Sequence, residues 1–299
     1  MSFVCFVVAL RMTPLALGIV LVAAFTHATW NYAAKRVGGG LPFVWLTGLL
    51  SFAFYIPAVT LYCFWTRPEL PGPVALVFIG SGLIKTAYAL LLQRGYRHGD
   101  FSLIYPLARG TGPLLSTFAA IALFGERPTL LALAGGAVIV ASVFYLTGGT
   151  SLLQADRSHL RQGMLYGFTC GCCIAAYTVW DQRAVSHLQL PPILYDCGTQ
   201  LVMTCVLTPF AWPRRAEAAQ TWREHRGKVL TVALLGPVGY VLILTAMTFT
   251  PVSYIAPARE ISILIGTFFG AHLLKEADAQ RRLLAAAGMV LGVIALALG

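Results

Sequence analysis

Two stretches of similar make-up decide the fold of this chain. The first, "SLIYPLARGTGPLL" at residues 102–115, is an apolar run interrupted by Pro106 and Arg109. The second, "VSYIAPAREISILI" at residues 252–265, is again an apolar run with a proline and an arginine. An arginine inside an apolar segment is costly, so the recurrence of the same interruption indicates two related halves.

The relation between the halves extends to other rare residues. Between residues 108–126 and 258–276, which are 150 residues apart, seven of nineteen positions are identical. The same offset of 150 residues aligns Trp30 with Trp180. Shared apolar composition would match leucine and alanine by chance, but it would not match tryptophan, arginine and glutamate at one constant offset. The sequence therefore predicts an internal repeat.

The composition is that of a membrane protein. Of the 299 residues, 58% are hydrophobic and 11% are charged, and the mean hydropathy is +0.76. Soluble domains contain about 25% charged residues, so this chain has too little polar surface for a water-soluble globule of its size. The net charge of +10 comes from basic residues that lie mostly in short gaps between apolar runs. That pattern orients membrane helices, and nucleic acid is not an expected partner.

Ten apolar segments approach the length of about 20 residues that a helix needs to cross a hydrocarbon core of about 30 Å. They span residues 13–34, 41–64, 72–93, 101–124, 128–147, 162–183, 191–211, 229–249, 252–274 and 281–298. Residues 1–150 and 151–299 hold five segments each, and an odd number makes the second half enter the membrane from the opposite side. The predicted fold is an all-α integral membrane protein of about ten transmembrane helices, in two inverted five-helix repeats around a central cavity. Such repeats are characteristic of secondary transporters.

The sequence carries no motif for catalysis or for a cofactor. The cysteine-rich "CGCC" at residues 170–173 lacks the spaced ligand sets of a zinc site. Its small residues are better explained by close helix packing, as are the GxxxG pairs Gly167–Gly171 and Gly288–Gly292. We therefore predict that the protein is not an enzyme and binds no cofactor.

Three stretches resemble a known family. "LFGERPTLLALAGGAVIVASVFYL" (123–146) and "LLKEADAQRRLLAAAGMVLGVIAL" (273–296) are similar to the junctions between the last two helices of each half in EamA-type drug/metabolite transporters. "THATWNYAAKR" (26–36) resembles the end of their first helix. Within that superfamily the chain looks most like the YddG-type aromatic amino acid exporters. The resemblance implies ten helices, two inverted repeats, a central cavity and the export of metabolites.

Polar and aromatic side chains inside the spans are the candidates for substrate binding, because a buried ionisable group usually faces a polar interior. The candidates are His27, Trp30, Asn31, Ser81, Lys85, Tyr88, Arg109, Tyr177, Trp180, Tyr240 and Arg259. His27, Trp30 and Asn31 are spaced i, i+3 and i+4, which places them on one helix face. The same spacing recurs in the second half from Tyr177. Together these residues predict a cavity rich in aromatic rings, with a few cations.

Structural explanations for the same residues stay open. Trp30 and Trp180 lie toward helix ends, where interfacial aromatic belts are found. Lys85 shares a face with Ser81 and could extend its ammonium to the membrane surface, although it lies near the middle of its span. His27 could donate to a backbone carbonyl. The glutamate that follows the fourth span, like its counterpart in the repeat, is expected to have a structural role in a short turn.

The proline before Arg109 suggests a helix that begins or is irregular inside the protein, where free N–H groups and the arginine would attract an anion such as a carboxylate. Arg259 would repeat this arrangement, and the alternative for either arginine is a structural pair with Glu260 or Asp181. Proton coupling through His27 or Glu260 and facilitated diffusion fit the sequence equally well.

Three functions compete. The first is a secondary transporter in the bacterial inner membrane that exports small amphipathic metabolites, above all aromatic and other neutral amino acids, by alternating access. The second is a transporter of phosphorylated solutes such as sugar phosphates or nucleotide-sugars. The third is an integral membrane enzyme acting on lipid, which would need clustered His, Asp or Glu that this chain lacks. The expected partners are a small-molecule substrate and the lipid bilayer, and a monomer is compatible with these features.

Overall fold

The computed structural model describes residues 12–38, 40–70, 72–98, 101–146, 157–266 and 279–299, and all regular structure in these ranges is helical. The helices of the first half are α2 (Pro14–Val37), α3 (Leu41–Thr66), α4 (Val74–His98), α5 (Phe101–Phe124) and α6 (Leu130–Leu146). The second half contains α7 (Arg157–Gln182), the π-helical turn η2 (Arg183–His187), α8 (Pro192–Ala211), the 3₁₀ turn η3 (Trp212–Arg214), α9 (Arg215–Met247), α10 (Val252–Ala258) and α12 (Ala279–Leu298). Nine of the predicted apolar segments lie along these helices, and the polar stretch after α8 is also helical. The predicted segment 252–274 begins with α10, is interrupted at residues 259–260, and from residue 267 lies outside the described residues.

Helix ends follow local chemistry. The hydroxyl of Thr13 accepts the N–H of Ala16 at 3.1 Å and so caps the first turn of α2. The same helix ends at Gly38, whose φ of 62° is the left-handed conformation that glycine adopts without strain. Helix α9 is longer than the predicted span because its first turns, before the non-helical His225, are polar. Here Arg214 hydrogen-bonds the exposed Glu217 and lowers the pKa of that carboxyl.

The two proline–arginine stretches differ in their backbone. Helix α5 runs without interruption through Pro106, contrary to the expected irregularity, because a proline removes only one helical hydrogen bond and the remaining ones hold. In the second half the helix stops after Ala258, and Arg259 and Glu260 form a turn before residues 261–266 resume a helix. The N–H of Glu260 bonds to the carbonyl of Pro257 at 3.0 Å, an i to i−3 bond that tightens the chain as in a 3₁₀-helix.

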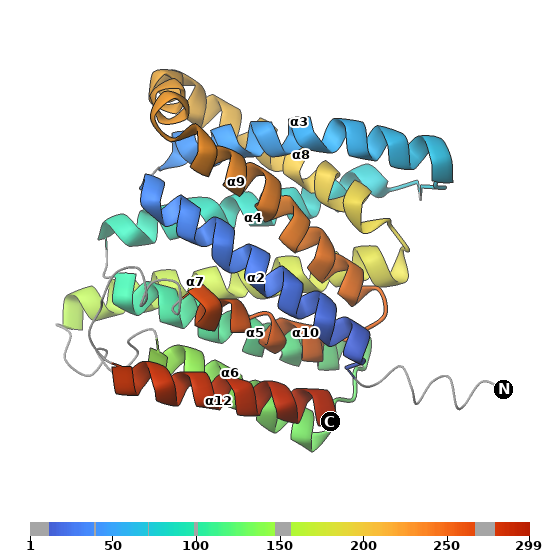
Figure 1. Ribbon diagram of the computed structural model, residues 1–299, viewed down its shortest axis with the longest axis vertical. Coiled ribbons are helices and arrows are strands. Elements are labelled where there is room, and N and C mark those ends of the chain that lie inside the picture. Colours follow the sequence, from blue (N-terminus) through green and yellow to red (C-terminus); the bar gives the residue numbers. More distant parts are fainter. Residues whose placement is uncertain (1–11, 39, 71, 99–100, 147–156, 267–278) are drawn as a thin grey trace.

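The helices are stacked side by side, from α3 at one edge of the molecule to the pair α6 and α12 at the other (Figure 1). Helix α2 packs on α9 and α4 packs on α7, while α3 packs on α8, α5 on α10 and α6 on α12. These contacts are symmetric between the two halves, because the 150-residue offset exchanges the first two pairs and maps each of the other three onto itself. Helix α2 begins and α12 ends at the same end of the molecule, on the right in Figure 1.

Glycines allow close contacts between helices. A Cβ on Gly135 of α6 would lie 2.6 Å from the carbonyl oxygen of Gly292 on α12, so the two backbones touch there. Gly288 contacts the Ser142 side chain in the same way, and Gly171 of α7 contacts Thr111 of α5. The GxxxG pairs therefore pack helices closely, as predicted.

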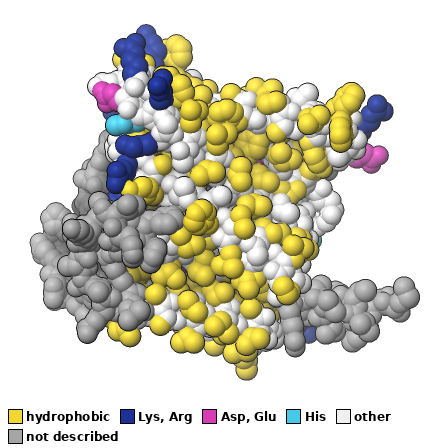
Figure 2. Space-filling model, in the orientation of Figure 1, with side chains coloured by type: hydrophobic (Ala, Val, Ile, Leu, Met, Phe, Trp, Pro, Cys, Tyr) yellow, Lys and Arg dark blue, Asp and Glu magenta, His cyan; other side chains and the backbone are white. Residues whose placement is uncertain are grey.

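The outside of the bundle is suited to lipid. Six described helical stretches are long and apolar enough to cross a membrane, and two shorter apolar helices accompany them. On the face seen in Figure 2, hydrophobic side chains form a broad band, and charged side chains gather toward its two ends. Exposed leucine and phenylalanine side chains on several helices contribute to this apolar surface. Such a surface would be unfavourable in water and is favourable in a bilayer.

Glu126, the glutamate that was predicted to have a structural role in a short turn, connects the two halves of the chain. Glu126 follows α5, and its two carboxylate oxygens accept the N–H groups of Val252 and Ser253, each at 2.9 Å. A carboxylate at the start of α10 satisfies donors that no helical carbonyl reaches. The structural role expected for Glu126 is confirmed, whereas its counterpart Glu276 lies outside the described residues.

Candidate functional site

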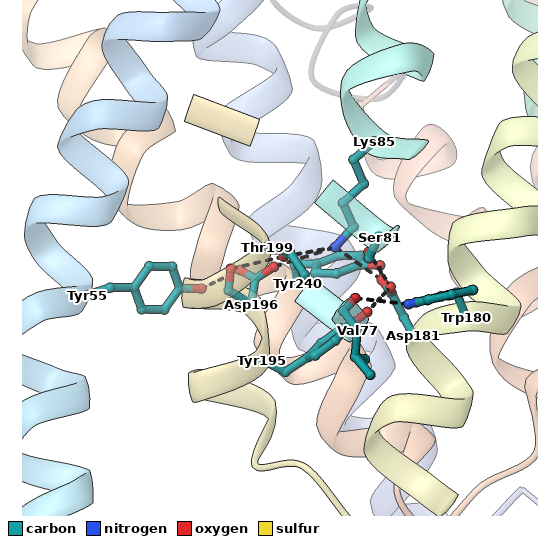
Figure 3. Close-up of polar contacts among 10 residues, drawn as sticks. All are labelled: Tyr55, Val77, Ser81, Lys85, Trp180, Asp181, Tyr195, Asp196, Thr199 and Tyr240. Atoms are coloured by element: carbon teal, nitrogen blue, oxygen red, sulfur yellow. Dashed lines mark hydrogen bonds and ion pairs between the residues drawn. The ribbon is translucent and has the colours of Figure 1, made fainter. Parts of the chain in front are cut away.

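The charged centre of the molecule is built around Lys85, in the middle of α4. Its ammonium Nζ lies 3.1 Å from Asp181 Oδ2, 3.8 Å from Asp196 Oδ1 and 3.3 Å from the Thr199 hydroxyl. These partners belong to α7 and α8, so the lysine crosses the space between three helices (Figure 3). Lys85 therefore does not extend to a membrane surface, because its charge is neutralised inside the bundle.

Asp181 is the most fully satisfied group in this centre. Its Oδ1 accepts hydrogen bonds from the hydroxyls of Ser81 and Tyr195, both at 2.5 Å, and its Oδ2 accepts one from Tyr240. Together with Lys85, donors from α4, α8 and α9 converge on one carboxylate that is fully buried. A buried carboxylate with this many donors is held in one orientation and holds its neighbours in turn.

Asp196 has fewer partners. The Tyr55 hydroxyl of α3 donates to its Oδ2, and Lys85 approaches Oδ1 only to 3.8 Å. The side chain of Asp196 is 9% exposed and that of Lys85 is 16% exposed, whereas Asp181 is completely enclosed. The two carboxylates on Lys85 therefore differ in both coordination and access.

Tyrosine rings surround the ammonium of Lys85. It lies 4.4 Å from the ring centre of Tyr240, 5.7 Å from that of Tyr195 and 5.9 Å from that of Tyr177. Tyr177 in turn meets Tyr88 edge to face, with ring centres 6.2 Å apart. Aromatic faces stabilise a cation and also offer apolar surface to a ligand.

A second charged cluster joins α5 to the broken helix that begins with α10. Arg109 Nε lies 3.0 Å from Glu260 Oε2, and Arg259 Nε lies 3.9 Å from Glu260 Oε1. All three residues are buried, so two guanidinium groups share one carboxylate. Among the described residues, the Nη2 atom of Arg259 has no hydrogen-bond partner.

The two clusters are neighbours. Tyr240, which hydrogen-bonds Asp181, also interacts electrostatically with Arg259. His27 of α2 interacts with both arginines in the same way. The centre of the bundle thus carries an excess of negative charge around Lys85 and an excess of positive charge around Glu260.

The structure brings some predicted site residues together and separates others. Ser81, Lys85, Tyr177 and Tyr240 meet in the lysine cluster, Tyr88 joins them through Tyr177, and Arg109 and Arg259 form the second cluster. His27 and Trp30 pack edge to face at 4.8 Å, and Asn31 donates to the His27 carbonyl at 2.9 Å. These three residues form a separate group on α2 that neighbours the arginines through His27.

Trp180 has a structural contact instead. Its indole N–H donates to the Val77 carbonyl at 3.0 Å, and its ring lies directly on Gly80, where a Cβ would come within 2.4 Å of it. The side chain is 41% exposed at the edge of the contact between α4 and α7. Trp180 therefore packs α4 against α7, and both its place in an interfacial belt and its role in the site stay predictions.

Sequence reasoning missed Asp196 and its partner Tyr55, and it considered Asp181 as a structural partner of Arg109 or Arg259. Asp181 is deep in the structure because α7 passes directly into η2 and the helical path continues to His187. Asp196 lies within a span, and Thr199 and Gln200 follow it at helical spacing, so this polar face was a signal in the sequence that was not used. Among the described residues, no group of three or more His, Cys, Asp or Glu is arranged to hold a metal ion.

These features define a class of protein, a multi-pass membrane protein with a charged centre inside an apolar bundle. The chain belongs to the EamA-like transporter family, whose model matches residues 14–148 and again residues 161–298. The family unit therefore occurs twice, as the internal repeat predicts. Members of this family, part of the drug/metabolite transporter superfamily, are membrane transporters and not enzymes.

The chain is also similar to a protein of known crystal structure. The two share 19% sequence identity with a TM-score of 0.76, and the match covers 95% of this chain and 98% of that chain. At this identity the likeness concerns the fold alone. No curated protein matches the chain.

Proposed function

We propose that this protein is a secondary transporter with ten spans in two inverted repeats, located in the bacterial inner membrane, which exports aromatic and other neutral amino acids by alternating access. The start of α2 and the end of α12 at one end of the molecule agree with an even number of crossings. The helix contacts that pair across the halves agree with two units able to rock against each other. The resemblance to aromatic amino acid exporters supports the direction of transport.

The observation that carries the substrate class is the separation of charge in the centre. Lys85 faces two carboxylates, and Glu260 faces two arginines. In a zwitterionic α-amino acid the ammonium and the carboxylate are both attached to the α-carbon. The carboxylate would pair with the guanidinium of Arg259, and the ammonium would pair with Asp196 and the tyrosine rings.

The apolar part of the substrate would lie against these rings. Burial of apolar surface contributes about 25 cal/mol per Å², so a side chain that buries about 100 Å² gains a few kcal/mol. That is enough for binding and weak enough for release. Transport does not need a stronger contact, because the substrate must dissociate from the site in every transport cycle.

A phosphorylated solute is the alternative, and it would need several cations free to face a dianion. Lys85 and Arg109 are held in close ion pairs at 3.1 and 3.0 Å, and Arg259 has only a contact of 3.9 Å, so a dianion that needs several cations would have to displace existing ion pairs, whereas a single carboxylate would need Arg259 alone.

The test is transport by the purified protein in liposomes. We expect labelled L-phenylalanine and L-leucine to cross, and a labelled sugar phosphate to be excluded. Arg259→Gln should raise the concentration needed for half-maximal flux by about tenfold, the effect of removing one charge-assisted contact. The exposed Arg214→Gln is the matched control and should transport like the wild type. If a sugar phosphate crosses and no amino acid does, the alternative is correct.

A further inference from the structure

The carboxylates around Lys85 outnumber the cations. Lys85 is the one basic residue that pairs with Asp181 or Asp196 among the described residues. Asp181 takes the shorter ion pair and three hydroxyl donors, so its charge is compensated. Asp196 has the longer contact to Lys85 and two hydroxyl partners, Tyr55 and Thr199. An ionised carboxylate buried with weaker compensation is unfavourable, and it is relieved by a proton or by another cation.

The exposure of its side chain also distinguishes Asp196 from the other buried carboxylates. The Asp196 side chain is 9% exposed, whereas the Asp181 side chain is fully enclosed. The other buried carboxylate, Glu260, is 1% exposed and lies within ion-pair distance of two arginines. Of these three carboxylates, Asp196 has the weakest contact with a cation and the most exposed side chain.

We propose that Asp196 is the proton-coupling residue of this transporter, and that a proton and the substrate ammonium occupy its carboxylate in turn. The inference rests on the proposed function, since it requires a substrate that carries an ammonium group. It replaces His27 and Glu260, the coupling candidates that the sequence suggested. The outcome is an exchange of one proton for one amino acid.

The groups that face Asp196 come from each helix around it. Tyr55 faces it from α3, Lys85 from α4 and Asp181 from α7. On α8 itself, Tyr195 and Cys197 interact with it electrostatically. Tyr240 of α9 faces Asp181 rather than Asp196. Burial and the negative charge of Asp181 favour the protonated carboxyl, and Lys85 with the hydroxyls of Tyr55 and Thr199 favours the ionised one.

The exchange balances in protons and charge. With the site open to the cytoplasm, the ammonium of the amino acid pairs with Asp196, and the carboxyl proton leaves to the water on that side. With the site open to the opposite side, the amino acid departs and a proton from that side binds Asp196. The zwitterion carries no net charge, so each cycle moves one positive charge inward, and a proton gradient drives export.

The deciding experiment measures proton release on substrate binding. L-phenylalanine is added to the purified protein in weakly buffered detergent solution that contains a pH indicator. We expect about one proton to be released per bound phenylalanine, and the affinity for phenylalanine to fall as the pH falls. Asp196→Asn should release no proton, bind phenylalanine at least about tenfold more weakly, and lose the pH dependence. Glu217→Gln, at an exposed carboxylate, is the matched control and should behave like the wild type.

A second variant keeps the carboxylate and changes its environment. Tyr55→Phe removes the hydroxyl that favours the ionised form, so phenylalanine binding should acquire its pH dependence at higher pH than in the wild type. This variant decides the question if Asp196→Asn does not fold. An unchanged pH profile in Tyr55→Phe, or proton release that persists in a folded Asp196→Asn, would overturn the inference.

Measurements on the wild-type protein show whether the coupling role alone fails or whether the proposed function fails as well. If phenylalanine binds and crosses liposomes without proton release, the coupling role of Asp196 is wrong and the transport function stands. If neither phenylalanine nor leucine binds or crosses, the proposed function fails and the coupling role fails with it.

Discussion

We expect Asp181→Asn to destabilise the wild-type protein but to stabilise a protein in which Lys85 has already been replaced by methionine. In the wild type, Asp181→Asn weakens four contacts of a buried carboxylate and should destabilise the protein by about 1.5–3 kcal/mol. Lys85→Met leaves two buried carboxylates without their shared cation. The loss of one partner of a buried pair costs about 3–5 kcal/mol. In the Lys85→Met protein, Asp181→Asn should therefore be stabilising.

The size of this reversal follows from the geometry. The two carboxylate oxygens lie 3.1 and 3.8 Å from the same Nζ, so they are at most about 7 Å apart. Two unit charges at that distance repel by about 2 kcal/mol when the effective dielectric constant is about 20. Neutralising Asp181 removes this repulsion, and the double variant should be about 1–2 kcal/mol more stable than Lys85→Met alone.

The assay is reversible unfolding of the four proteins of the cycle in mixed detergent micelles, followed by helical circular dichroism. The same cycle on the exposed pair of Arg214 and Glu217 is the control, and it should give no measurable coupling. If Asp181→Asn destabilises the wild type and the Lys85→Met protein equally, the carboxylates do not interact across Lys85, and the charge argument for the site is wrong.

Three further outcomes are expected. Gly135→Ala should destabilise the protein by about 1–3 kcal/mol in the same unfolding assay, because its Cβ meets backbone atoms of α12. Gly18→Ala, where a Cβ meets nothing within 4 Å, should be neutral or stabilising, and equal stability of the two variants would contradict the close packing. Glu126→Ala should cost about 1–2 kcal/mol and speed hydrogen exchange of the first amides of α10, whereas unchanged exchange would show that the cap is not formed in solution. Trp180→Phe should cost about 1 kcal/mol of stability and leave phenylalanine affinity unchanged, since Trp180 contacts Val77, and a large loss of affinity would return it to the site.

The helices could be predicted because hydropathy and length are local properties of the chain. Nine of the ten predicted apolar runs are helical, and the constant spacing of rare residues revealed the repeat that the family model also finds. The backbone at the prolines could not be predicted in this way. The sequence treats Arg109 and Arg259 as equivalent, yet α5 is continuous and the second helix breaks at Arg259. The difference depends on hydrogen bonds at the break and on packing, which local composition does not record.

The site could be predicted where its members share one helix. Ser81 and Lys85 are four residues apart on α4, and both bond to Asp181. The remaining contacts are long-range, such as that of Tyr55 with Asp196, whose positions differ by 141 residues. No spacing rule connects such residues. Asp196 was missed although it lies inside a predicted span and shares a polar face with Thr199 and Gln200.

The charged centre breaks the symmetry that the fold maintains. The 150-residue offset relates Lys85 to Leu235, Asp196 to Leu46 and Asp181 to Asn31, so no partner position in the other half carries a charge. The contact of α4 with α7 therefore holds an ion pair, whereas its counterpart between α2 and α9 holds none. Inverted repeats can exchange conformations between two states, but fixed charges cannot be exchanged. Under the proposed mechanism the same carboxylates would serve the substrate in both states, and a single residue such as Asp196 would couple both halves of the cycle.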